Sequence, residues 1–141
     1  MNPYSKYQET QIKTADQGKL ILMMYDGAII FLQQAREMMK EKDYIGKAEK
    51  ISKTQDILFE LIAALNMEAG SIAKNLKSLY MYMIKRLFDA NIKKDTLAIE
   101  ETIKILSELR IAWEKISSKS EVINKADILK TNISSTQMAH L

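Results

Sequence analysis

The chain has 141 residues, a formal net charge of +3 and no cysteine. A single domain of this size can bury a sufficient core without a disulfide or a metal, and the lack of cysteine excludes thiolate sites and is typical of a reducing cytoplasm. The small charge, spread over interspersed lysines and acidic residues, argues against a nucleic-acid partner, which usually requires a concentrated basic stripe.

The first apolar run lies between Leu20 and Leu32 and resembles the hydrophobic part of a signal peptide. Asp26 and Gly27 interrupt this run, and no small-x-small cleavage site follows it. The run is also shorter than the roughly 20 apolar residues that span a bilayer. We therefore expect no membrane insertion and a cytoplasmic location.

Apolar spacing in steps of three and four predicts four amphipathic helices. The first two begin after Asp16 and Asp43, which are favourable N-cap residues. The positions that follow this spacing in the first helix are Leu20, Met24, Ala28, Phe31, Ala35 and Met38. Those of the second helix are Tyr44, Ala48, Ile51, Gln55, Leu58, Ile62 and Leu65.

The third helix follows Gly70-Ser71, and Asp95 is the N-cap of the fourth. The positions that follow the helical spacing in the third are Ile72, Leu76, Leu79, Met83, Leu87 and Ala90. Those of the fourth are Ile99, Ile103, Leu106, Leu109, Trp113 and Ile116. Because the connectors are short, successive helices are expected to be antiparallel neighbours.

These elements predict an all-α fold, an antiparallel up-down-up-down four-helix bundle. The bundle is expected over residues 16–117. Residues 1–15 form a separate N-terminal segment, and residues 118–141 form a polar, mobile tail with room for a short helix at 126–130.

The sequence offers no constellation for catalysis. The one histidine, His140, lies beside the C-terminus and is interpreted as a solvated tail residue rather than a base or a ligand. No Glu-x-x-His pair, cysteine nucleophile or Gly-rich phosphate loop is present. We therefore expect no enzymatic activity, no catalytic residues, no metal site and no cofactor.

Two helices carry more apolar surface than one face of a bundle helix can bury. Between Leu20 and Leu32 only Asp26 and Gly27 are neither apolar nor aromatic, and a helix that is apolar all round must be covered on all sides. Residues 79–84 of the third helix repeat this pattern. The cover is one of three things: the flanks, a second copy of the chain, or a client.

Methionine is common where a groove adapts to a partner helix, because its side chain is flexible and polarisable. Several methionines lie in or beside the two apolar runs, although each alone is more typical of ordinary core filling. The candidate residues for a client groove are Met24, Tyr25, Leu79, Tyr80, Tyr82 and Met83.

An ordered set of segments carries a resemblance to a known family. They are Tyr7-Gln8, Thr14-Ala15, Lys19-Leu20-Ile21, Met24-Tyr25-Asp26-Gly27-Ala28, Leu65 with Glu68 and Gly70, Ile72-Ala73-x-Asn75-Leu76, Leu79-Tyr80-x-Tyr82-Met83, Arg86-Leu87, Ala90-Asn91 and Glu108-Leu109-Arg110-x-Ala112-Trp113. In this order and spacing, over roughly residues 4–116, the chain resembles the flagellar secretion chaperone FliS family.

The resemblance implies an antiparallel four-helix bundle that binds the disordered C-terminal segment of flagellin in the cytoplasm. It also implies that the chaperone prevents early polymerisation and delivers flagellin to a component of the flagellar type III export gate. Further partners implied for the family are an anti-sigma factor and flagellar assembly factors. The rival function is therefore a helical adaptor or regulator of flagellar assembly without flagellin as its main client.

Three positions depart from the family pattern. Asp16-Gln17 replaces a frequent Ser-Pro, Ser71 replaces the second glycine of a turn, and Met81 replaces a frequent Asp. The first change keeps an N-cap, the second leaves the geometry of the turn open, and the third makes the third helix more apolar. The resemblance implies nothing about the tail after Ser117.

The N-terminal segment is expected to act as a latch over part of the client groove, with Tyr4, Tyr7 and Ile12 as apolar anchors. A free chaperone requires such a cover, because an exposed apolar strip favours aggregation. The alternative is that these residues are disordered or serve as a contact for the export gate.

A nucleic-acid-binding bundle remains the weakest rival. Its basic candidates are Lys47, Lys50, Lys53 and Lys125. Glu49 and Asp56 lie among them, which argues against a clustered basic face.

Overall fold

The computed structural model describes the backbone of residues 17–130 and the side chains of residues 17–116. Within this part the chain forms four long helices and no strand. The helices are α2 (Gln17–Lys40), α3 (Tyr44–Ala63), α4 (Ser71–Lys93) and α5 (Thr96–Lys130), with a short 3-10 helix η1 (Met67–Ala69) before α4.

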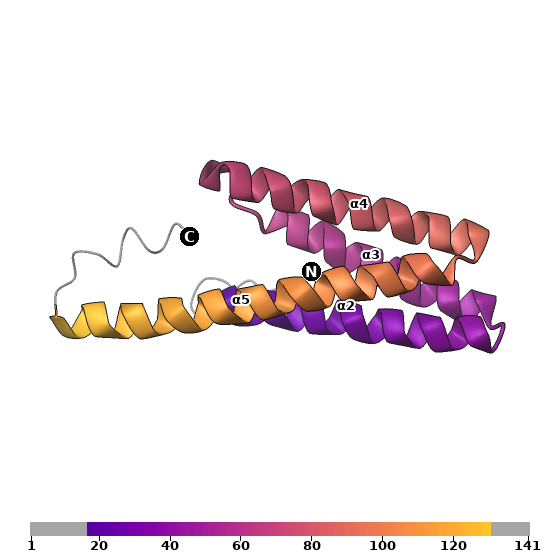
Figure 1. Ribbon diagram of the computed structural model, residues 1–141, viewed down its shortest axis with the longest axis horizontal. Coiled ribbons are helices and arrows are strands. Elements are labelled where there is room, and N and C mark those ends of the chain that lie inside the picture. Colours follow the sequence, from indigo (N-terminus) through magenta and orange to yellow (C-terminus); the bar gives the residue numbers. More distant parts are fainter. Residues whose placement is uncertain (1–16, 131–141) are drawn as a thin grey trace, which may run out of the picture.

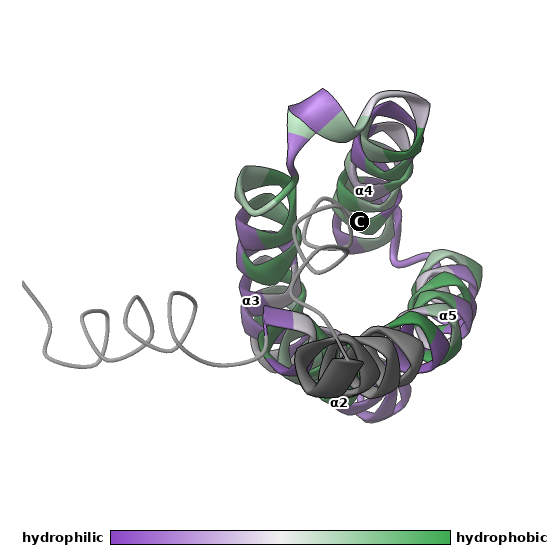
Figure 2. Ribbon diagram, turned by 90° about the vertical axis from the view of Figure 1, so that its left-hand side faces the viewer, coloured by the Kyte–Doolittle hydropathy of each residue, from purple (hydrophilic) through white to green (hydrophobic). Residues whose placement is uncertain are grey.

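The helices follow one another around a ring, and successive helices run antiparallel (Figures 1 and 2). Helix α2 packs against α3 and α5, and α4 packs against the same two neighbours from the opposite side. The expected antiparallel four-helix bundle is therefore confirmed.

Short polar side chains begin two of the helices as expected. The carboxylate of Asp43 accepts a hydrogen bond from the backbone N–H of Gly46 at 3.0 Å, which caps α3. Asp95 accepts from the backbone N–H of Leu97 at 3.0 Å and caps α5. Each cap satisfies a backbone donor that has no partner within its helix. The third expected cap, Asp16, lies outside the described residues.

Two glycines explain the geometry of the connectors. Gly70, with φ of 80°, adopts a left-handed conformation immediately before α4, which costs a glycine little. Ser71 already belongs to the helix, so this turn requires one glycine only. At Gly46 an added Cβ would lie 2.5 Å from Asp43 Oδ2 and 2.8 Å from the Met38 sulfur, so a side chain there would displace the carboxylate that caps α3.

The core lies along the bundle axis and differs in phase from the expected stripe of the first helix. The fully buried apolar residues of α2 are Ile21, Tyr25, Ala28, Leu32 and Ala35. Of the expected positions, Ala28 and Ala35 are buried, whereas Leu20, Met24, Phe31 and Met38 are only half-buried. Because α2 is apolar on several faces, periodicity alone does not select the buried one.

The other helices contribute the remaining core. Its buried apolar members are Ile51, Leu58, Leu61, Ala73, Tyr80, Met83, Leu87, Ala90, Ala98, Ile99 and Leu106. Most are long aliphatic side chains, each of which stabilises the fold by about 1.5–3 kcal/mol when buried.

Helix α5 continues to Lys130, well beyond Ile116, the last position expected in the fourth helix. Residues 117–130 contain neither glycine nor proline, so nothing in their backbone chemistry ends the helix early. In Figure 1 this part of α5 projects past the other helices. The N-terminal segment 1–15 and the last residues of the expected tail, 131–141, lie outside the described residues.

Candidate functional site

Many large apolar side chains remain exposed although the core is well filled. Those on α4 and α5 are Ile72, Met81, Tyr82, Phe88, Ile92, Leu97, Ile111 and Ile116. Those on α2, α3 and η1 are Met23, Ile30, Ile45, Phe59 and Met67. An apolar residue exposed singly needs no explanation, but a contiguous group marks an interaction surface.

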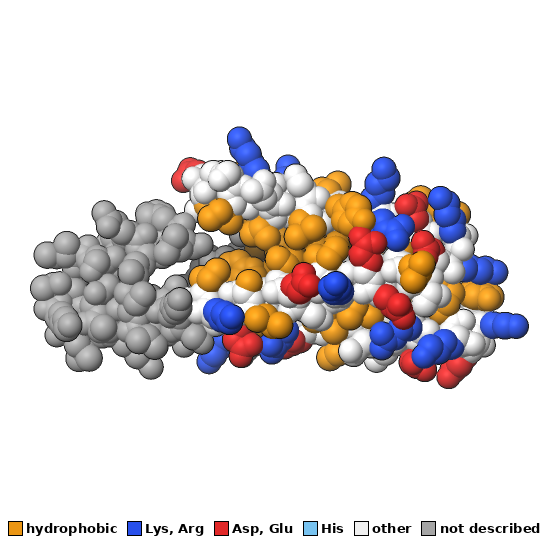
Figure 3. All heavy atoms as spheres, viewed as in Figure 1, with side chains coloured by type: hydrophobic (Ala, Val, Ile, Leu, Met, Phe, Trp, Pro, Cys, Tyr) orange, Lys and Arg blue, Asp and Glu red, His pale blue; other side chains and the backbone are white. Residues whose placement is uncertain are grey.

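Such a group follows the boundary between α4 and α5. Figure 1 shows these two helices closest at their connector and further apart toward the start of α4. Figure 3 shows hydrophobic side chains on both sides of this boundary. We define the seam strip as Ile72, Leu76 and Leu79 of α4 together with Ile105, Leu109, Trp113 and Ile116 of α5.

The register between the helices supports this grouping. Tyr82 of α4 donates a hydrogen bond to Glu101 of α5. Because the helices are antiparallel, one turn toward the start of α4 corresponds to one turn toward the end of α5. Leu79 therefore lies opposite Ile105. The exposed Ile72 lies opposite the part of α5 between Ile105 and Ile116.

The seam ends at a polar network near the α4–α5 connector. Arg86 of α4 donates from its Nε to Glu101 at 3.2 Å, and its Nη1 lies 3.6 Å from the Asp95 carboxylate. The hydrogen bond with the Glu101 carboxylate raises the pKa of the Tyr82 hydroxyl. These contacts hold the two helices together at one end, and among residues 17–116 no comparable polar link joins them at the apolar end.

Beneath the seam strip, two tyrosines meet in the core. The hydroxyls of Tyr25 and Tyr80 are 2.5 Å apart, and both side chains are buried. Burial raises the pKa of both hydroxyls. The contact joins α2 to α4 across the core, and Trp113 of the seam strip packs against the same core.

Asp26, which interrupts the apolar run of α2, has a structural role. It accepts a hydrogen bond from Nε of Arg110 on α5, and the same guanidinium donates from Nη1 to Glu114 at 3.0 Å. The pair joins α2 to α5 on the opposite side of α5 from α4. Sequence reasoning assigned no role to Asp26 or Arg110, because a contact 84 residues apart has no local signal.

The structure divides the predicted groove residues into two sets. Tyr25, Tyr80 and Met83 are buried in the core and present no surface in the described conformation. Leu79 and Tyr82 lie at the seam, while Met24 is half-buried on α2. Three of the six predicted residues therefore reach solvent. The anchors predicted for the latch, Tyr4, Tyr7 and Ile12, lie outside the described residues.

The basic candidates on α3 do not form a free cationic face. Lys47 is buried and donates from Nζ to the backbone carbonyl of Asn91 at 3.0 Å, which satisfies a carbonyl at the end of α4. Burial lowers its pKa. Lys50 and Lys53 lie over the Phe31 ring, with Nζ 5.5 and 5.6 Å from its centroid. These contacts are structural.

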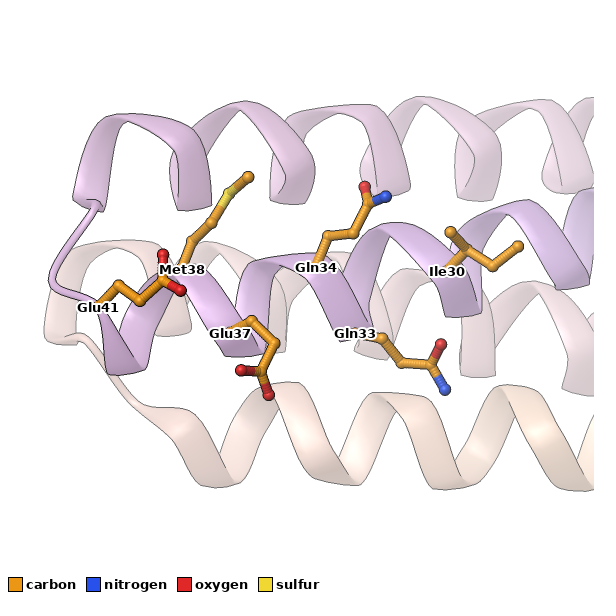
Figure 4. Close-up of a pocket in the computed structure, with 6 residues that line it drawn as sticks. All are labelled: Ile30, Gln33, Gln34, Glu37, Met38 and Glu41. Atoms are coloured by element: carbon orange, nitrogen blue, oxygen red, sulfur yellow. The ribbon is translucent and has the colours of Figure 1, made fainter.

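A shallow hollow runs along the outer side of α2 (Figure 4). It is lined by Ile30, Gln33, Gln34, Glu37, Met38 and Glu41. All six belong to one helix and the turn that follows it, so the hollow gives little of the enclosure typical of small-molecule sites.

Among residues 17–116 no three His, Cys, Asp or Glu side chains come together as a group able to hold a metal ion. None of the four helices described combines the length and the apolar character needed to cross a bilayer.

A helical bundle with an apolar strip between two helices is typical of helical protein-binding modules. The family model described as "Flagellar protein FliS" matches residues 1–120, and the chain belongs to this family.

The chain is also similar to three flagellar secretion chaperones named FliS. It is 41% identical to that of Salmonella typhimurium over 79% of this chain and 84% of the relative. It is 35% identical to that of Bacillus subtilis, over 81% and 85% of the two chains. It is 32% identical to that of Vibrio cholerae, over 85% and 89%. The chain is therefore a member of a chaperone family that is not an enzyme family.

Proposed function

We propose that this protein is a cytoplasmic export chaperone that binds the C-terminal segment of flagellin. It prevents premature polymerisation and delivers flagellin to a component of the flagellar type III export gate. Membership of the FliS family supports the flagellar role. The observation that carries the mode of binding is the seam strip, where α4 and α5 present half-buried and exposed apolar side chains along their boundary.

The strip suits a segment that folds as it binds. A disordered client loses conformational entropy on ordering, and it recovers this cost only by burying a large apolar surface. An amphipathic client helix would place its apolar face against Ile72 and Leu79 on one side and Ile116 on the other. Affinity then depends on mass action alone, so the client remains releasable for export.

The predicted groove residues take different parts in this proposal. Leu79 and Tyr82 contact the client directly at the seam. Tyr25, Tyr80 and Met83 form the floor beneath it and act through the side chains that they support. Met24, on α2, would be reached only by a client that extends around the bundle.

The N-terminal segment completes the proposal as a latch. Tyr4, Tyr7 and Ile12 would occupy part of the strip in the free protein and be displaced by the client. Two or three partly buried side chains contribute roughly 1–2 kcal/mol each, and ordering the segment costs a similar amount, so the hold is weak.

The proposal is tested by the affinity of purified protein for a flagellin C-terminal peptide from the same organism, measured by isothermal titration calorimetry. We expect Ile72→Asp to weaken binding at least tenfold, because a charge replaces a hot-spot side chain in the strip. Ile45→Asp is the matched control, since Ile45 is even more exposed but lies on α3.

Three results would contradict parts of the proposal. If the wild-type protein does not bind the peptide, flagellin is not the client, and the rival adaptor or regulator function is favoured. An anti-sigma factor or assembly factor captured by the same strip would support that rival. Equal weakening by both substitutions would place the site elsewhere.

A further inference from the structure

Helix α4 carries a concentration of positive charge that the chain as a whole does not show. Its only acidic residue is Asp89, and its basic residues are Lys74, Lys77, Lys85, Arg86 and Lys93, which gives the helix a net charge of +4. The whole chain has a net charge of +3, so all the other segments together are close to neutral. Charges that are interspersed elsewhere are therefore unbalanced on this one helix.

Three of these lysines share one side of α4 with three large apolar residues. Successive helical residues differ in direction by about 100°, so each of the six lies within about 40° of the direction of Met81. At 1.5 Å per residue they extend over about 27 Å of the helix. We define the α4 stripe as Lys74, Lys77, Met81, Lys85, Phe88 and Ile92.

The α4 stripe points away from the bundle. Met81, Phe88 and Ile92 are 46%, 58% and 64% exposed, and the three lysines are exposed as well. None of the ion pairs between described residues involves a lysine of the stripe. Figure 3 shows basic and hydrophobic side chains along the outer edge of α4.

The stripe is separate from the seam strip. The seam residues of α4, which are Ile72, Leu76 and Leu79, lie about 140–180° around the helix from Met81. The two surfaces therefore occupy opposite sides of α4, and a partner of one does not need the other.

The mixture of residues on the stripe indicates the chemistry of its partner. Lysines alone would suit any polyanion, including a nucleic acid, but phosphate contacts make no use of exposed Phe88 and Ile92. A partner helix docks in a groove between elements, whereas the stripe lies on the convex side of a single helix. A bilayer with anionic lipids needs no groove, and it takes apolar side chains into its headgroup region while its phosphates attract lysines.

We propose that the α4 stripe attaches the protein peripherally to a membrane surface that contains anionic lipids. Met81, Phe88 and Ile92 enter the headgroup region, and the flanking lysines extend to the lipid phosphates. The bundle stays outside the hydrocarbon core, and the seam strip on the other side of α4 remains open to a client. This inference goes beyond the proposed function and does not depend on the identity of the client.

The charge of the stripe is tested by co-sedimentation of the full chain with vesicles of phosphatidylethanolamine and phosphatidylglycerol. A lysine near an anionic surface contributes about fivefold in affinity, so Lys74→Gln/Lys77→Gln/Lys85→Gln should bind roughly a hundredfold more weakly. The matched control, Lys19→Gln/Lys42→Gln/Lys104→Gln, removes the same charge from exposed positions outside α4 and should bind almost as wild type does. Circular dichroism checks that both are folded, and single lysine variants replace a triple variant that is not.

The apolar part of the stripe is tested with the same vesicles. Phe88→Gln should weaken binding about tenfold, because an aromatic side chain no longer enters the headgroup region. Phe59→Gln is the matched control, since Phe59 is 52% exposed but lies on α3, and it should bind as wild type does. Vesicles of phosphatidylcholine alone should bind weakly, and added salt should weaken binding to the anionic vesicles.

Three results would overturn the proposal. The first is wild-type protein that leaves the anionic vesicles unbound. The second is an equal loss in the two triple variants, which would indicate an effect of net charge alone. The third is equal binding by Phe88→Gln and wild type, because lysines without the apolar residues would suit a nucleic acid or an acidic protein instead. No flagellin peptide is used, so these outcomes are independent of the proposed function.

Discussion

Neighbouring residues within one apolar run of this protein differ in burial, so some belong to the core and others to the surface. Met81 and Met83 are two positions apart on α4, yet Met81 is 46% exposed and Met83 is fully buried. Successive helical residues differ in direction by about 100°, so an uninterrupted apolar run necessarily divides between core and solvent.

This difference gives a prediction at the residue scale. Met83→Glu should destabilise the fold by more than about 3 kcal/mol, because it places a carboxylate without a partner in the core. Met81→Glu is the matched control and should change stability by less than about 0.5 kcal/mol. Urea unfolding followed by circular dichroism measures both, and a stable Met83→Glu protein would contradict the buried position of Met83.

Helix starts are the elements that the sequence predicted best. Asp43 and Asp95 act as the expected caps because an N-cap is a local interaction, with donor and acceptor two or three residues apart. The end of α5 was not predictable in the same way. This part of α5 projects past the other helices (Figure 1). The apolar spacing that predicted the helix ends at Ile116, whereas the helix continues to Lys130.

The Asp95 cap can be tested separately from its charge. Asp95→Ala removes the acceptor for the N–H groups of Leu97 and Ala98 and should cost about 0.5–2 kcal/mol. Asp95→Asn retains an acceptor but loses the ion pair with Arg86, so it should cost less than the alanine variant. Thermal unfolding in low and high salt distinguishes the two contributions. Equal losses in both variants would show that the ion pair, not the cap, stabilises the start of α5.

For the molecule as a whole, the bundle and its connectivity followed from spacing and short loops, whereas the interior of the site did not. The Tyr25–Tyr80 contact joins residues 55 positions apart, and no local pattern indicates it. Tyr25 and Tyr80 were predicted as groove residues because they lie in apolar runs that contain methionines. Their burial depends on how four helices pack together, which single-helix periodicity does not contain.

The predicted latch is tested on the whole protein. Deletion of residues 1–15 should raise the affinity for the flagellin peptide, because the client no longer competes with the segment, and should lower the solubility of the free protein. A full-length variant with Tyr4, Tyr7 and Ile12 replaced by serine should behave in the same way if the apolar anchors are responsible. Calorimetry and light scattering measure the two effects. If neither quantity changes, residues 1–15 are not a latch.

The antiparallel order of the helices also has a practical consequence. Helix α2 begins, and α5 leaves the bundle, at the end where α4 starts and the seam strip is open. A bulky label attached at the start of α2 would therefore lie at the open end of the strip and compete with a client for space. The connectors at Lys42 and Lys94 lie at the opposite end of the bundle, so a label attached there would leave the strip free.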